Sequence, residues 1–309
     1  MDIDLTNPIF HDEAKATAHM EADRWPDGVN CPFCGSVNIR RMEGKTQAGM
    51  FLCNDCRDKF TVRTKTIFER SHIPLHKWLM ATHIMAASKK SVSALQLQRM
   101  LGLGSYRSAW FMCHRIREAM KPAKVGPLGG EGKIVEADET YIGGKETNKH
   151  VSKRKKGNLG GKGKQVIFAL VERDGMSHSF HVAKISGKDL RPYIVENVNR
   201  KSSLMTDEGG QYYHVGKEFA RHETVNHGAD EYVRGDAYTN TAEGRFALMK
   251  RAVYGAHHSI SEAHLPRYLT EWDFKWNTRK MKDGERAAFA LRGAQGRRLT
   301  YRNPHVAAN

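Results

Sequence analysis

Four cysteines in this sequence have the spacing of a metal site. Cys31 and Cys34 form one Cys-x-x-Cys pair, Cys53 and Cys56 form a second, and 18 residues separate the pairs. In a cytosolic chain disulfides are rare, so four thiolates at this spacing indicate one tetrahedral zinc ion. Four free or redox-active cysteines are the alternative, which the tandem spacing disfavours. The fifth cysteine, Cys113, lies in an apolar helical pattern and is expected to be a buried thiol.

Three acidic residues could hold cations of another kind. Asp138, Asp207 and Glu243 lie in the segments EADETYIGG, SSLMTDEGG and TNTAEGRF. Three carboxylates that converge repel one another, so convergence implies a hard cation with oxygen ligands, Mg²⁺ or Mn²⁺. Two such ions about 3.5 to 4 Å apart can assist an in-line phosphoryl displacement. Taken singly, each acid could be a solvent-facing charge, and Asp138 with Glu136 could line an exposed strand face.

The segment from Thr239 to Gly255 must position the third acid. Its apolar residues recur at three- and four-residue spacing and predict a helix that begins just after Asn240, a favoured N-cap residue. Glu243 and Lys250 then project from nearly one line, two turns apart. The structural alternative for Glu243 is a capping box, in which it bonds back to the Asn240 amide.

Strand-like periodicity surrounds the two aspartates. Residues 134–142 alternate in polarity, and a hairpin is expected over 165–185 with its turn at Asp174 and Gly175. A helix near 189–198, a strand that ends at Asp207 and a further strand at 222–227 follow. This order predicts an α/β fold with a mixed sheet, in which ligands gather at the strand ends.

Residues 74–121 are predicted to be helical. Two helices joined at Gly102 to Gly104, the second of them basic, have the pattern of a helix-turn-helix. A purely structural helical linker is the alternative. The predicted DNA contacts in this region are Ser105, Tyr106, Arg107 and Arg115.

The charge balance favours a polyanionic partner. The 309 residues include 50 Lys and Arg against 34 Asp and Glu, a formal net charge of +16 that is spread along the chain. Nucleic acid is the leading partner and an anionic membrane the weaker one. A glycine-rich basic loop at 145–164 is expected to lie on phosphates. Further predicted DNA contacts are Lys153, Arg154, Lys155 and Lys156 in this loop, and Lys250 and Arg251 in the helix.

Neither a bilayer-spanning apolar stretch nor a signal peptide is recognisable, which predicts a cytoplasmic, nucleoid-associated protein without a membrane partner. We expect an N-terminal helix and zinc ribbon at 1–72 and a helix-turn-helix region at 73–122. A linker at 123–133 would then lead to a catalytic domain at 134–309.

Taken together, these segments resemble DDE-type insertion-sequence transposases that carry an N-terminal zinc ribbon and an ISXO-like catalytic domain of RNase H-like fold. The resemblance covers most of the chain, and its most specific block runs from Asn240 to Arg279. It implies that Asp138 and Asp207 are metal-binding aspartates and that Glu243 is the third acid. It also implies that Lys250 contacts a transposon-end phosphate.

The family varies at its third acidic position, so the resemblance leaves Asn240 as an auxiliary ligand or a helix cap. Tyr238 stands where the family often has a histidine. Four histidines are candidates for phosphate or water contacts, with ordinary surface or core roles as the alternative: His227, His257, His258 and His264.

The activity implied is that of a transposase that binds the terminal repeats of an insertion sequence, cuts DNA in a metal-dependent reaction and joins the ends to target DNA. Because two ends must be held together, a homodimer or larger assembly on DNA is expected. Two alternatives stay open: a DNA-binding regulator derived from a transposase, and a metal-dependent nuclease without strand transfer.

Overall fold

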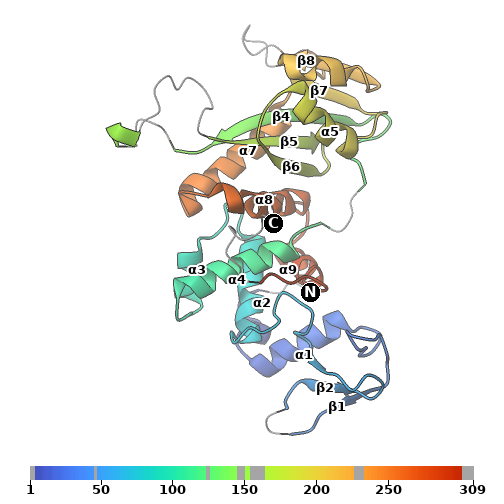
Figure 1. Cartoon of the computed structure of the whole chain (residues 1–309), viewed down its shortest axis with the longest axis vertical. Helices are drawn as coiled ribbons and strands as arrows, with labels where there is room; N and C mark the ends of the chain where they lie inside the picture. The colour runs from blue at the N-terminus through green and yellow to red at the C-terminus, as the bar shows by residue number, and fades with distance from the viewer. Residues whose placement is uncertain are drawn as a thin grey trace. The chain divides into compact units, whose positions relative to one another are not determined.

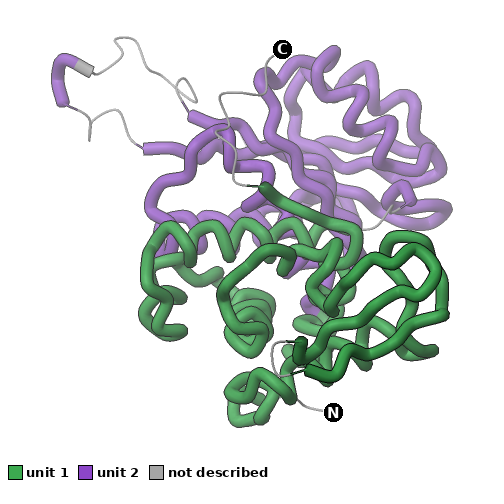
Figure 2. The backbone as a smooth tube through the Cα atoms, turned by 60° about the horizontal axis from the view of Figure 1, so that its bottom comes forward, with its two compact units in different colours: residues 1–122, 280–309 green, residues 123–279 purple. Residues whose placement is uncertain are grey.

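The computed structural model describes residues 4–44, 47–122, 126–144, 150–153, 164–225 and 233–300. The chain divides into two compact units, Met1–Pro122 with Lys280–Asn309 and Ala123–Arg279 (Figure 2). Each unit is described by itself below. Among the described residues, no helix combines the length and the apolar character that crossing a membrane requires.

A helix and a small antiparallel sheet form the N-terminal part of the first unit (Figure 1). A 3₁₀ turn at Pro8–Phe10 precedes the predicted N-terminal helix. The sheet has the order β1-β2-β3, and stacked Phe51 and Phe60 rings with the edge of Trp25 form its small core. The elements are α1 (Glu13–Arg24), β1 (Ile39–Arg41), β2 (Met50–Cys53) and β3 (Lys59–Thr61).

Four more helices complete the first unit: α2 (Leu75–Ala87), α3 (Ala94–Met100), α4 (Tyr106–Ala119) and α9 (Asp283–Arg292). Helix α9 packs against α2 and α4. The predicted catalytic domain extended to residue 309, whereas the structure groups Lys280–Asn309 with the N-terminal unit. The difference arises because local sequence patterns carry no information on which core the buried residues of α9 join.

A five-stranded mixed sheet organises the second unit, so the predicted α/β class is confirmed. Its order is β6-β5-β4-β7-β8, antiparallel among the first three strands and parallel among the last three. The predicted hairpin turns at Asp174, which has the left-handed φ of 58°. The strands are β4 (Ile134–Ile142), β5 (Gln165–Glu172), β6 (Ser177–Val182), β7 (Ser203–Asp207) and β8 (Arg221–Val225).

Alternation along the strands builds one core on each face of this sheet. Phe168 and Leu170 of β5 pack in one core with Leu190 and Ile194 of α5 (Gly187–Asn197). Ile167, Ala169 and Val171 pack in the other, beneath α7 (Asn240–Ala252) and α8 (Leu265–Asn277). Side chains from even-numbered β4 positions therefore face α7, whereas odd-numbered positions face α5.

Part of the predicted linker belongs to the second unit. Leu128 is 1% exposed and forms a parallel bridge with Val198. Its backbone N–H donates to Asn197 O at 2.8 Å, and its carbonyl accepts from Asn199 N at 2.9 Å. The glycine and proline content of residues 123–133 predicted a linker, but it did not reveal that Leu128 joins the core of the second unit.

Candidate functional site

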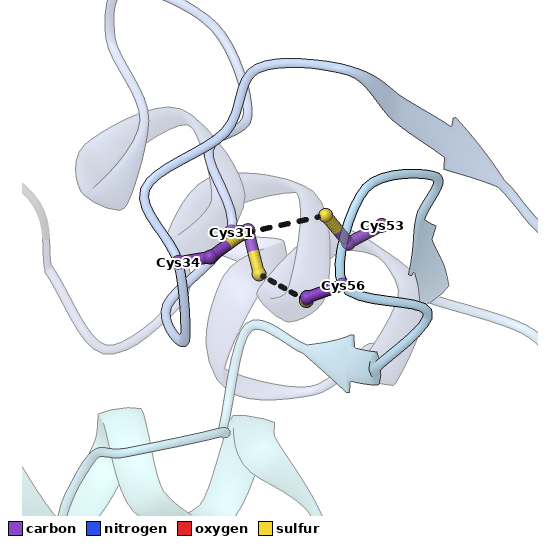
Figure 3. Close-up of side chains that lie close together, drawn as sticks. All are labelled: Cys31, Cys34, Cys53 and Cys56. Atoms are coloured by element: carbon purple, nitrogen blue, oxygen red, sulfur yellow. Dashed lines mark hydrogen bonds between the residues drawn. The ribbon is translucent and has the colours of Figure 1, made fainter.

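The four paired cysteines converge within the first unit (Figure 3). Their sulfur atoms all lie within 4.8 Å of one another. Cys31 Sγ lies 3.6 Å from Cys56 Sγ, and Cys34 Sγ lies 3.6 Å from Cys53 Sγ. Four sulfurs about 2.3 Å from a shared zinc ion would be about 3.8 Å apart in a tetrahedron. The donor set and its dimensions therefore fit a structural zinc ion.

The two cysteine turns have the same backbone geometry. Gly35 N donates to Cys31 O at 2.9 Å, and Arg57 N donates to Cys53 O at 3.0 Å. Gly35 and Arg57 both adopt left-handed φ values, 78° and 65°. In the second turn, backbone N–H groups of Cys56 and Asp55 lower the pKa of the Cys53 thiol to about 7, which favours the thiolate. Local backbone geometry thus holds both cysteine pairs in the same kind of turn.

The two predicted catalytic aspartates occupy equivalent positions on neighbouring parallel strands. The register of β4 and β7 pairs Glu136 with Met205, and Asp138 and Asp207 each follow two residues later. Both carboxylates therefore leave the same face of the sheet, the face that α7 covers. Each accepts a nearby backbone N–H, Asp138 from Glu139 at 2.7 Å and Asp207 from Gly209 at 3.0 Å.

Glu243 brings the third carboxylate to this face from the first turn of α7, which packs against β4 and β5. Burial and, to a smaller extent, the negative charges of Glu139, Asp207 and Glu243 raise the pKa of Asp138 to about 7, against the opposing effect of the backbone hydrogen bond from Glu139. A carboxyl group that keeps its proton this close to neutral pH is one that a divalent cation would deprotonate. Oxygen donors in this electrostatic setting fit Mg²⁺ or Mn²⁺.

Glu136 was not predicted as a buried residue, and its possible place on an exposed strand face is wrong. Its side chain is 0% exposed, and it forms an ion pair with Arg173 (Nε to Oε1, 2.6 Å). It also accepts hydrogen bonds from Thr241 Oγ1 and Ala242 N, both at 2.9 Å. A lone carboxylate at this depth would be costly, so these donors keep it stable there. Period-two alternation along β4 predicts which face of the sheet Glu136 lies on, but it does not predict that the side chain is buried.

Glu139 lies on the opposite face of β4 and connects it to the turn after Asp207. Its carboxylate accepts from Gln211 Nε2 at 2.7 Å and from the hydroxyl of the fully buried Tyr212. Burial raises the pKa of Glu139. A Cβ atom on Gly209 would lie 2.3 Å from Gln211 Nε2, so a side chain at this position would shift the Gln211 amide from its present place against Glu139. Sequence reasoning missed this connection because no local spacing encodes it.

The remaining predicted residues of α7 lie along the same helix. Asn240 is its first residue and Thr239 is the N-cap, so the predicted Asn240 cap is wrong. Glu243 is consequently the fourth helical residue rather than the third, which removes the capping-box spacing. Lys250 is half-buried and Arg251 exposed in the last turn.

Three of the four predicted contacts in the helix-turn-helix region are exposed. Ser105 caps α4 by accepting Ser108 N at 3.1 Å, and Tyr106 and Arg107 follow on its surface. Arg115, in contrast, is 8% exposed and donates to Glu69 O at 2.8 Å. Arg115 therefore has a structural role. Its position in the helical repeat lies on the buried face of α4, and this position rather than its charge decides where the side chain lies.

The predicted basic loop gives little further geometry. Lys153 ends a 3₁₀ turn that begins at Val151. Arg154, Lys155, Lys156 and His227 lie outside the described residues. Among the other histidines, His257 belongs to a π-helical turn after α7 and packs edge-on against Tyr268, while His258 has a left-handed φ of 58°.

Fold and sites together define a class: a protein with a four-cysteine ribbon that fits zinc, followed by a mixed-sheet α/β domain that carries carboxylates on one face of its sheet. Residues 127–277 match the ISXO2-like transposase domain family, and residues 11–59 match the transposase zinc-ribbon domain family. The chain belongs to the transposases that combine these two domains.

A relative from an insertion element agrees with this assignment. A protein in the transposable element ISH50 of Halobacterium salinarum is 27% identical over 279 residues, a match that covers 86% of this chain and 91% of the relative.

Proposed function

We propose that this transposase cleaves DNA at the terminal repeats of an insertion sequence and joins the freed ends to target DNA. The observation that supports this most directly is the placement of Asp138 and Asp207 at equivalent positions on neighbouring parallel strands, with Glu243 on the helix that covers the same face. In this proposal the unit has an RNase H-like fold, which its strand order and parallel β4–β7–β8 edge support.

Each acid has a defined part in the proposed chemistry. Asp138, Asp207 and Glu243 would hold Mg²⁺ or Mn²⁺, which would supply charge stabilisation for the attacking and leaving oxygens of an in-line displacement. Asp138 would release its proton when it binds the cation, since burial and neighbouring charges hold the pKa near 7. Neither cleavage of the DNA nor joining of its ends would require a covalent bond between enzyme and DNA.

The DNA would be held by basic groups on both units. Lys250 and Arg251, in the last turn of the helix that carries Glu243, would contact phosphates near the cleaved strand, with Asn240 as an auxiliary ligand at the other end of the helix. Ser105, Tyr106 and Arg107 would contact the terminal repeat. Lys153, Arg154, Lys155 and Lys156 would add phosphate contacts. Two such chains would together hold the two DNA ends. The reaction would take place in the cytoplasm, on the nucleoid.

A strand-transfer assay with pre-cut terminal-repeat DNA tests the proposal. With Mg²⁺ present, the protein should cut intact terminal-repeat DNA and join the pre-cut 3′ ends to a target plasmid. A nuclease without strand transfer would cut the intact DNA and leave the pre-cut ends unjoined. Binding of the repeats without cutting, under conditions in which the protein carries zinc, would instead establish the regulator and refute the proposal.

A further inference from the structure

A carboxylate that the proposed chemistry does not use lies between the metal-binding strand and the helix of the third acid. Glu136 is on β4, two residues before Asp138, and its side chain is 0% exposed. It accepts the N–H of Ala242, the third residue of α7, at 2.9 Å. In most helices the side chain of the N-cap residue accepts this N–H, so here a residue from the sheet has taken over helix capping.

The same carboxylate holds the segment that leads into α7. Arg173, ion-paired with Glu136, donates to Asp236 O at 2.7 Å and to Tyr238 O at 2.8 Å. Its guanidinium also stacks on the Tyr238 ring, with Cζ 3.4 Å from the ring centroid. Arg173 thus holds the chain that enters the helix at two residues, Asp236 and Tyr238, and its ion pair with Glu136 limits where the helix can begin.

This arrangement relates two of the proposed metal ligands through a short path. Asp138 is two residues from Glu136 on one rigid strand, and Glu243 directly follows Ala242 on the helix. A negative charge beneath a helix N-terminus is favoured by the helix dipole and by the free N–H groups of the first turn. Displacement of that turn would move Glu243 away from Asp138, whereas the more distant contacts of α7 and α8 with the sheet would remain.

We propose that Glu136, together with Arg173, is a positioning residue that holds the N-terminus of α7 so that Glu243 and Asp138 bind the same cation. This proposal rests on the proposed function, since it assumes that these two carboxylates are ligands. Glu136 itself stays with Arg173, Thr241 and Ala242 and does not contact the metal.

Mn²⁺ binding to the zinc-loaded full chain, followed by electron paramagnetic resonance of the free ion, tests the proposal without a requirement for catalysis. Glu136→Gln removes the ion pair and should weaken Mn²⁺ binding by about tenfold or more. Thr241→Val removes one 2.9 Å hydrogen bond to Glu136, changes no charge, and should weaken binding by about threefold. Because charge is constant in this second variant, a weakened affinity reports positioning rather than lost attraction for the cation.

Glu271→Gln is the matched control. Glu271 is also 0% exposed and ion-paired, with Lys275 Nζ at 2.6 Å, but it lies on α8. The Glu271→Gln variant should lower the melting temperature about as much as Glu136→Gln does and leave the Mn²⁺ affinity unchanged. Thr241→Val and Glu136→Gln proteins with the affinity of this control would overturn the positioning role. Failure of the wild-type chain to bind Mn²⁺ would refute the metal site of the proposed function, and the positioning role with it.

Discussion

The four cysteines of the zinc ribbon and the three proposed metal-binding carboxylates are brought together in opposite ways. All four cysteines come from residues 31–56, and one backbone turn brings each pair together. The three carboxylates come from β4, β7 and α7, and 104 residues lie between the first and the last of them. Within the described chain, the cysteines form a group whose ligand atoms lie within 4.8 Å, a convergence that these three carboxylates do not reach.

The difference has a physical cause. Without metal, burial and the neighbouring thiols raise the pKa of Cys56 to about 12 against a backbone hydrogen bond from Asp58, so Cys56 stays neutral and hydrogen-bonded and the four sulfurs need not carry four charges at once. Carboxylates repel one another, and the raised pKa of Asp138 records that repulsion together with its burial. We therefore expect the ribbon to depend on its metal for folding. The α/β unit has large cores of its own, and under the proposed function it would need cations only for chemistry.

Zinc removal should produce the largest effect and would test this contrast directly. One zinc per chain is expected, and apparent binding energies of about 10 to 16 kcal/mol in small zinc domains are largely folding energy. Chelation should unfold residues 28–62, whose core is little more than Trp25, Phe51 and Phe60, and spare the α/β unit. Hydrogen exchange with mass spectrometry reports both regions at once. A single transition that melts the whole chain would contradict the independence of the two regions.

Loss of a carboxylate should have the opposite pattern, an intact fold and no chemistry. Asp138→Asn, Asp207→Asn and Glu243→Gln should each reduce cleavage of terminal-repeat DNA by more than about a hundredfold while end binding survives, because one charged ligand is lost. Glu243→Gln is the most informative, since a purely structural Glu243 would tolerate it. Wild-type cleavage rates from both Glu243→Gln and Asp207→Asn would end the case for this mechanism.

The stability of the metal-free α/β unit should depend on pH through Asp138. Its folded pKa is about 7, against an ordinary value of 3.8, so between these values the folded state binds more protons than the unfolded state. Stability should therefore fall as pH rises from about 4 to 7, by roughly 2 to 4 kcal/mol, and level off above. Urea unfolding at pH 5 and pH 8 measures it. In Asp138→Asn the decrease should shrink by this amount; an unchanged decrease would show that another group causes it.

The smallest effect expected is that of Lys250→Ala. Loss of one phosphate contact should weaken DNA binding and lower the slope of log K against log salt by about one, with both metal sites still loaded. Fluorescence anisotropy across a salt series provides the slope. Arg107→Ala offers a comparison in the other unit, because it should alter recognition of the terminal repeat rather than cleavage-site binding. An unchanged slope for Lys250→Ala would remove it from the DNA interface.

Prediction from the sequence succeeded where residue type and local spacing carry the information. The cysteine pairs, the strand order around Asp138 and Asp207 and the helix bearing Glu243 were all predicted, and the structure contains them. It failed at Arg115 and Glu136, which are charged yet buried. Charge predicts exposure in isolation, but an interior carbonyl or a buried arginine can offset the cost of burial, and such partners come from distant parts of the chain.

By itself, the sequence determined the ligand types and the elements that bear them, since thiolate spacing and hydrophobic period are local properties. Only the tertiary structure decided that Glu136 caps α7, that Glu139 holds the turn after Asp207, and that α9 packs with the N-terminal unit. These contacts join residues from 72 to about 200 positions apart. The hydrophobic pattern of a segment specifies which face of its strand or helix a side chain lies on. The residue that the side chain contacts is specified only when the sheet and helices have packed.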